Sequence, residues 1–299
     1  MRRRPPSWAM ASVALLCVVL PVNGCEAQSR GAPPAANETA QAPLPAAPPT
    51  PPTAGLDGLD ARVRQATADA AKSGANIETV VLDRNTGQTI SNGNTNPFPI
   101  ASVAKLFIAD DLLMQASKGQ TTLSPADRQS LDVMLRSSDD SAAQTFWNRG
   151  GGNAILARVK ARYGLPGTTA PSNGHWDVTT STASDLVQYY GKLLDGSGGL
   201  PPEQANVIIG NLAQSTPTGT DGYPQRFGIP EGLYAEPVAV KQGWFCCWSG
   251  ANQLHVSTGV IGPDRRYVMA ISSLESDDAA AARDTMTQAV KTMFPGGKI

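Results

Sequence analysis

The 299-residue sequence is short of histidine and lacks a common serine-hydrolase motif, and both shortages narrow the chemistry that it can support. Its two histidines, His175 and His255, lie far apart and without metal-ligand spacing, so we expect no metal site and no other cofactor. A G-x-S-x-G nucleophile elbow is also absent, which disfavours a Ser-His-Asp triad.

Charged residues make up 16% of the chain, and neither sign dominates. The formal net charge is −1, and loss of Arg2, Arg3 and Arg4 with a leader leaves 21 basic against 25 acidic residues, a net charge of −4. A nucleic-acid-binding protein needs a basic face, so the composition argues against that class. Beyond residue 25, no apolar run is long enough to cross a bilayer.

The first 25 residues have the features of an export signal. The basic "MRRR" precedes the apolar stretch "WAMASVALLCVVLPV", and "VNGC" follows. The residues before Cys25 resemble a bacterial lipobox, so residues 1–25 are predicted to be a lipoprotein signal peptide and Cys25 the lipidated residue. An ordinary secretory signal cut nearby is the alternative. Both predict export, and lipidation places the protein at the outer face of the cell membrane or in the cell envelope.

Residues 26–54 are rich in proline and alanine and have no apolar periodicity, so they cannot bury a core. We expect a disordered, extended tether there. Residues 55–299 remain for the folded domain, and the hydrophobic content of 41% in the whole chain suits a substantial core.

Apolar spacing predicts the order of helices and strands in this domain. A helix near 56–72 precedes a hairpin of two short strands that turns near residues 84–87. Three strand-like runs near 236–241, 252–261 and 266–274 precede a C-terminal helix. Between the hairpin and the first of these three runs, helical patterns lie near residues 102–117, 124–147, 153–163, 182–196 and 201–215. The predicted fold class is α+β: a five-stranded antiparallel sheet, with the terminal helices on one face and an all-helical lobe on the other.

A first candidate for chemistry is "PFPIASVAKLFIADDLL", residues 97–113, in which Ser102 and Lys105 begin a helical pattern. Residues i and i+3 share a helix face, and the apolar positions that follow are typical of a buried helix. Burial lowers the pKa of a lysine, which makes it usable as a base for a nearby hydroxyl. An N-cap serine with a solvated lysine is the alternative, because the motif alone is weak.

Two further motifs follow: Ser138-Asp139-Asp140 within "LRSSDDSAAQTFW", and Lys241-Gln242-Gly243 on a predicted strand. Together with Ser102-x-x-Lys105 they resemble, in order, the S-x-x-K, S-D-N and K-T-G signatures of class A serine β-lactamases and penicillin-binding proteins. The flanking segments are similar to that family across residues 56–299. The chain also resembles the β-lactamase-like lipoproteins of mycobacteria.

The resemblance implies a role for each matching residue. Ser102 would be the acylated nucleophile and Lys105 its base or proton relay. Ser138 would pass a proton towards the leaving nitrogen, helped by Lys241, which would also attract a substrate carboxylate. The backbone N–H groups of Ser102 and Trp244 would form the oxyanion hole. The substrate-binding residues would be Asp140, Gln242, Gly243 and Trp244.

Three features depart from the family pattern. Asp140 replaces an asparagine, and its carboxylate cannot donate a hydrogen bond unless protonated and would oppose an anionic substrate. Gln242 replaces a small threonine, and we expect its side chain to intrude on the carboxylate subsite. The family's Ω-loop glutamate has no counterpart, because Ser141–Trp176 contains no acidic residue. Efficient β-lactam hydrolysis by the class A route is therefore not expected, and an acyl-enzyme should be long-lived.

The adjacent residues Cys246 and Cys247 can be either joined in a disulfide or present as free thiols. An oxidising compartment permits a disulfide between them near the rim of the site. However, adjacent Cα atoms strain such a ring, and successive strand side chains face opposite ways. These arguments favour two free thiols or a labile bond.

Two functions fit the sequence. The first is an exported serine acyl-enzyme that acts on β-lactams or peptidoglycan-type peptides and deacylates slowly. The second is a catalytically inactive, β-lactamase-like envelope lipoprotein that serves as a binding or scaffold module. We expect a monomer that is held at the membrane by its lipid anchor, has a small-molecule or peptidoglycan-type partner and does not bind nucleic acid.

Overall fold

The computed structural model describes residues 56–248 and 250–299. The predicted signal peptide, Cys25 and the predicted tether lie outside the described residues. Within the described ranges, no helix combines the length and the apolar character needed to cross a membrane.

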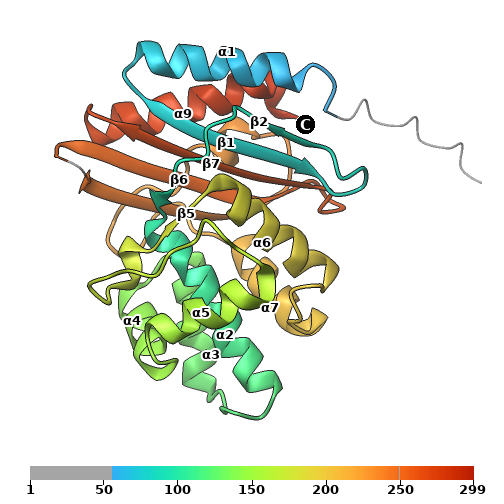
Figure 1. The fold of residues 1–299 in the computed structure, drawn as a ribbon, viewed down its shortest axis with the longest axis vertical. Coiled ribbons are helices and arrows are strands. Elements are labelled where there is room, and N and C mark those ends of the chain that lie inside the picture. The colour runs from blue at the N-terminus through green and yellow to red at the C-terminus, as the bar shows by residue number, and fades with distance from the viewer. Residues whose placement is uncertain (1–55, 249) are drawn as a thin grey trace, which may run out of the picture. The chain divides into compact units, whose positions relative to one another are not determined.

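Five antiparallel strands form the central sheet, in the order β2-β1-β7-β6-β5 (Figure 1). The N-terminal hairpin therefore pairs with the last strand of the chain, and β5 is an edge strand. The bounds are β1 Asn76–Asp83, β2 Thr89–Ser91, β5 Val238–Trp248, β6 Asn252–Ile261 and β7 Tyr267–Glu275. The predicted five-stranded α+β fold is confirmed.

The terminal helices α1 (Leu59–Lys72) and α9 (Ala279–Met293) lie side by side over one face of the sheet (Figure 1). The predicted apolar stripe of α1 is buried there, and it meets methionine and valine side chains of α9 in one cluster. The short helix α8 (Ile229–Gly232) packs against α9 and against β5 and β6. This layer supports the side of the sheet that faces away from the helical lobe.

The helical lobe covers the other face (Figure 1). Its helix α2 (Lys105–Ser117) is buried at every position from Lys105 to Met114, as its apolar sequence predicts. Helix α6 (Ala183–Asp195) packs against β1 and β7 and joins this lobe to the sheet. The remaining helices of the lobe are α3 Pro125–Arg136, α4 Asp140–Arg149, α5 Asn153–Tyr163 and α7 Pro202–Leu212.

Local structure departs from the sequence-based expectation where the lobe meets β5. The helical region predicted near 124–147 is divided at Ser138, whose φ of 58° interrupts the helix. Asp139 then caps α4, because its side chain accepts a hydrogen bond from the Ala142 backbone N–H. The predicted helix start at Ser102 is a 3₁₀ turn, η1 (Ala101–Ala104).

A two-stranded sheet not predicted from the sequence fixes the approach to Ser102. It pairs β3 (Phe98–Pro99) with β4 (Thr180–Ser181). The next backbone N–H, that of Ile100, donates to the carbonyl oxygen of Thr179 over 2.9 Å. The segment before Ser102 is therefore anchored to the segment before α6.

Candidate functional site

Four predicted residues, Ser102, Lys105, Ser138 and Lys241, converge where the β5 edge meets the helical lobe. The Lys105 Nζ lies 2.7 Å from the Ser102 Oγ and 2.7 Å from the Ser138 carbonyl oxygen. The Lys241 Nζ donates to the Ser138 Oγ over 2.5 Å. Three distant parts of the chain, the start of α2, the α3–α4 connection and β5, thus meet in one hydrogen-bonded group.

Both serines of this group lie at or next to a residue with an unusual backbone conformation. Ala101, directly before Ser102, has φ 47°, and Ser138 itself has φ 58°. Non-glycine residues rarely adopt this left-handed conformation, which costs about 1–3 kcal/mol and is concentrated at functional sites. The strain is compatible with a role for both serines, since the surrounding structure has to hold them in place.

Gly243 allows β5 to pass close to the turn that bears Ser102. A Cβ atom at this position would lie 2.5 Å from the backbone oxygen of Ile100. Only glycine fits that approach without displacing the backbone. Gly243, which is predicted to bind substrate, therefore allows the strand that bears Lys241 to approach the turn that bears Ser102.

The two lysines are buried, with exposed fractions of 0% for Lys105 and 1% for Lys241. Burial lowers the pKa of Lys105, whereas the Asp140 carboxylate, 2.5 Å from its Nζ, acts in the opposite direction. Burial also lowers the pKa of Lys241 well below its usual value, and the nearby Lys105 adds to that effect. Both lysines therefore lose part of their preference for the charged form.

Asp140 lies at the surface of the site, and its side chain is 72% exposed. It begins α4, and its carboxylate pairs with the buried Lys105. The residue that departs from the family pattern is therefore a direct partner of the predicted base.

Gln242 does not reach the predicted carboxylate subsite, so that expectation is wrong. Its side chain is 1% exposed, and its Nε2 donates to the backbone oxygens of Gln225 and Phe227. Successive strand side chains point to opposite faces, so Gln242 faces away from Lys241. Trp244, two residues on, stacks on Tyr223 with ring centroids 4.8 Å apart.

The structure joins Cys246 and Cys247 in a disulfide, so of the two predicted states, free thiols or a labile bond, the free thiols are excluded. Their side chains do not alternate as in a regular strand, because β5 is irregular at this point. Its pairing with β6 shifts register between Phe245 and Trp248, and Cys247 has φ 70°. Both cysteines are exposed.

Two residues of the site, Trp176 and Asp221, are not among those predicted from the sequence. The ring of Trp176 lies 4.7 Å from the Lys105 Nζ, in the segment that lacks acidic residues. The Asp221 carboxylate is near enough to act electrostatically on both Lys105 and Lys241. Neither residue belongs to a motif or a periodic pattern, so no sequence signal could have found them.

The histidines do not take part in this group. His255 is buried and its Nε2 lies 2.6 Å from the Tyr223 hydroxyl, whereas His175 is exposed. In the described part of the chain, no three His, Cys, Asp or Glu side chains are grouped in a way that could hold a metal ion.

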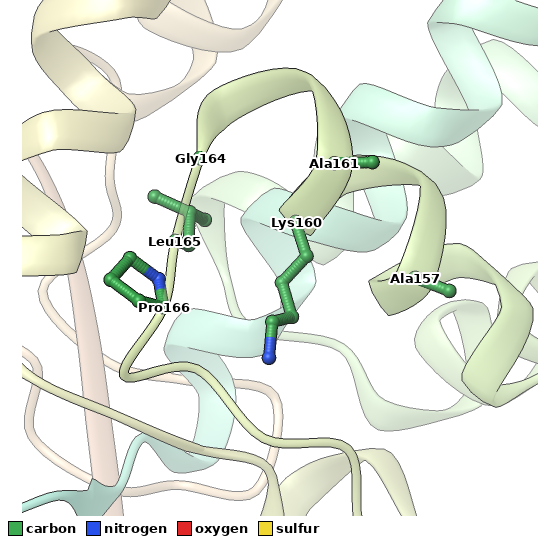
Figure 2. A pocket seen from close by; sticks show the side chains of 6 residues that line it. All are labelled: Ala157, Lys160, Ala161, Gly164, Leu165 and Pro166. Carbon is green, nitrogen blue, oxygen red and sulfur yellow. The ribbon is translucent and has the colours of Figure 1, made fainter.

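An open pocket of about 710 Å³ lies elsewhere, along α5 and the turn that follows it (Figure 2). It contains none of the four converging residues, and Lys160 is the one ionisable side chain in its lining, so it offers no comparable chemistry. The lining residues are Ala157, Lys160, Ala161, Gly164, Leu165 and Pro166.

The fold is the one shared by β-lactamases and penicillin-binding proteins. The model of the "Beta-lactamase enzyme family" matches residues 60–129, which include Ser102 and Lys105. Among solved structures, a β-lactamase from Chitinophaga pinensis is similar with a TM-score of 0.64 and 16% identity, covering 78% of this chain and 98% of that chain. A mutant of PBP-A in an acyl-enzyme complex with penicillin G gives a TM-score of 0.65 and 18% identity, covering 79% and 94%.

Closer relatives are found in mycobacteria. The chain is 55% identical, over an alignment of 317 residues that covers 100% of both chains, to the proteins named "Putative lipoprotein LppW" of Mycobacterium bovis and Mycobacterium tuberculosis. The chain therefore belongs to the family of the proteins named "Putative lipoprotein LppW", and it has the fold of class A β-lactamases and penicillin-binding proteins.

Proposed function

We propose that this protein is an exported, lipid-anchored serine acyl-enzyme whose Ser102 is acylated by β-lactams or peptidoglycan-type peptides. The main support is the convergence of two buried lysines, Lys105 and Lys241, on the hydroxyls of Ser102 and Ser138. The PBP-A mutant, which has a similar fold, forms an acyl-enzyme with penicillin G, and this agrees with the same reaction here.

In the proposed acylation, neutral Lys105 takes the proton of the Ser102 hydroxyl while the Ser102 Oγ attacks the substrate carbonyl carbon. The carbon–nitrogen bond of the amide breaks, and a proton passes to the leaving nitrogen through the Ser138 hydroxyl. The Ser138 Oγ lies 3.4 Å from the Lys105 Nζ, which fits such a relay. The lowered pKa of Lys105 supports its role as base. The backbone N–H groups of Ser102 and Trp244 would stabilise the developing oxyanion.

Slow deacylation follows from the groups around Lys105. Trp176 places an aromatic ring near its Nζ, and an indole ring cannot activate water as a base. Of the neighbouring carboxylates, Asp140 is engaged in the ion pair with Lys105, and Asp139 and Asp221 accept hydrogen bonds from the Ala142 N–H and the Trp244 indole N–H. We therefore propose that the acyl-enzyme is formed faster than it is hydrolysed.

A second candidate function is a non-catalytic binding or scaffold module. The observation that favours it is again the ion pair between Asp140 and Lys105. A carboxylate at this distance stabilises the protonated lysine, which cannot accept a proton from Ser102.

The proposal extends to the segments outside the described residues. The lipoprotein name of the mycobacterial relatives supports a signal peptide over residues 1–25 and lipidation at Cys25. Residues 26–54 would then tether the domain of residues 55–299 to the outer face of the cell membrane.

Intact-mass spectrometry of the mature chain after exposure to a fluorescent penicillin tests the acylation. We expect a stable increase by the full mass of the penicillin, because ring opening releases no fragment. Ser102→Ala should abolish the adduct, whereas Ser197→Ala, at an exposed serine after α6, should retain it. A folded wild-type protein that forms no adduct with any β-lactam tried would contradict the proposal and favour the binding module.

A further inference from the structure

Three carboxylates surround the Ser102 site and come from two distant parts of the chain. Asp139 and Asp140 stand at the start of α4, and Asp221 belongs to the loop between α7 and α8. That loop runs beside the Ser138 segment, because the Thr220 N–H donates to the Ser137 carbonyl oxygen over 2.8 Å.

Hydrogen bonds hold each of these carboxylates in place. The Asp139 Oδ1 accepts from the Ala142 N–H over 2.7 Å, and the Asp140 Oδ1 accepts from the Lys105 Nζ. The two oxygens of Asp221 accept from the Tyr223 N–H over 3.0 Å and from the Trp244 indole N–H over 3.1 Å. Charges that are fixed before binding need little reorganisation when a ligand arrives.

The charges of the site are arranged by depth. Lys105 and Lys241 are almost completely buried, whereas the Asp140 side chain is largely exposed and Asp221 is exposed as well. An entering substrate therefore meets the carboxylates before it comes near the lysines. This arrangement repels a negatively charged group at the mouth of the site and attracts a positively charged one. It therefore opposes the attraction of Lys241 for a substrate carboxylate that the family resemblance implies.

An aromatic pair lies beside Asp221 and fixes its position. The rings of Tyr223 and Trp244 are stacked with an interplanar angle of 9°, and the guanidinium carbon of Arg283 lies 4.9 Å from the centroid of Tyr223. Tyr223 therefore already contacts Trp244 and the Arg283 cation, and its ring is not assigned to a ligand. The pair holds the Asp221 carboxylate, which accepts from the Trp244 indole N–H.

We propose that this site selects substrates that carry a positively charged group beside the scissile carbonyl, such as a peptide with a free ammonium group, over anionic ones. The inference rests on the proposed acylation of Ser102 and names the substrate class of that same site. Asp140 and Asp221 are the residues that set the preference.

Four penicillins form a matched set for the test. Ampicillin differs from penicillin G by one amino group on the acyl chain, and the methyl ester of each removes the ring carboxylate charge. Acylation rates would be measured by intact mass at about pH 6.5, where an α-amino group is mostly protonated. We expect the ammonium group and the ester each to accelerate acylation on the order of tenfold at low salt, and less at high salt.

The variants Asp140→Asn and Asp221→Asn should each reduce the ratio of the acylation rate with ampicillin methyl ester to the acylation rate with penicillin G. Because Asp140→Asn also changes the partner of Lys105, the ratio is compared and not the absolute rate. Asp221 forms no hydrogen bond with either lysine, but its charge acts on both, so Asp221→Asn is a second variant that is also compared through the ratio. Asp57→Asn, at an exposed carboxylate before α1, is the control and should leave the ratio unchanged.

The outcomes separate this inference from the proposed function. Equal acylation by all four penicillins, or a ratio that survives the double replacement of Asp140 and Asp221, would overturn the charge preference and leave acylation intact. A wild-type chain that none of the four acylates would contradict the proposed function, and with it the inference.

Discussion

Gly243 permits a quantitative test of how closely β5 approaches the turn that bears Ser102. Its missing Cβ would lie 2.5 Å from the backbone oxygen of Ile100 and 3.3 Å from side-chain atoms of Ala101 and Val103. The Ile100 oxygen is held in place, since it accepts a hydrogen bond from the Val103 N–H over 2.9 Å. Gly243→Ala must therefore push the edge strand and the turn apart.

The magnitude follows from the cost of overpacking, which is about 1–3 kcal/mol for an added carbon in a tightly packed position. In a domain of this size each kcal/mol lowers the melting temperature by about 2–4 °C, so we expect a fall of about 2–12 °C. Gly210→Ala is the matched control. Gly210 lies inside α7 with no atom within 4 Å of an added Cβ, so the same replacement should stabilise by about 0.5–1 kcal/mol.

Thermal and urea unfolding followed by circular dichroism would measure both variants, together with acylation by a fluorescent penicillin. Gly243→Ala should also slow acylation by at least about tenfold, because displacement of β5 separates the Lys241 Nζ from the Ser138 Oγ. A Gly243→Ala protein that unfolds at the wild-type temperature and is acylated at the wild-type rate would refute this reasoning.

Two further predictions concern pH and redox state. Burial raises the pKa of Glu78 from 4.5 to about 7, so the folded state favours the protonated carboxyl and stability should fall as pH rises between these values. In Glu78→Gln, the urea midpoint should change less with pH across this range. An unchanged slope would contradict the raised pKa of Glu78. Separately, Cys246 and Cys247 should resist alkylation in the unreduced protein and take up two alkyl groups after reduction. Labelling before reduction would show that the disulfide is absent.

Regular elements were predictable because their signals are local. Helix α5 occupies Asn153–Tyr163, the range that its apolar spacing predicts, and α6 ends before Gly196, whose φ of 80° suits a glycine. The break at Ser138 was not predictable in the same way. Its left-handed backbone is held by contacts from Lys105 and Lys241, which lie far away in the sequence.

The order of the three motifs, the burial of α2 and hence the desolvation of Lys105 depend on residue type and on short-range spacing, so all of them can be predicted from the sequence. The direction of the Gln242 side chain, the pairing of Asp140 with Lys105 and the presence of Trp176 and Asp221 at the same site become visible only in the folded chain. The physical reason is that each of these contacts joins segments brought together by packing of the sheet against the helical lobe. No local sequence pattern predicts such long-range contacts.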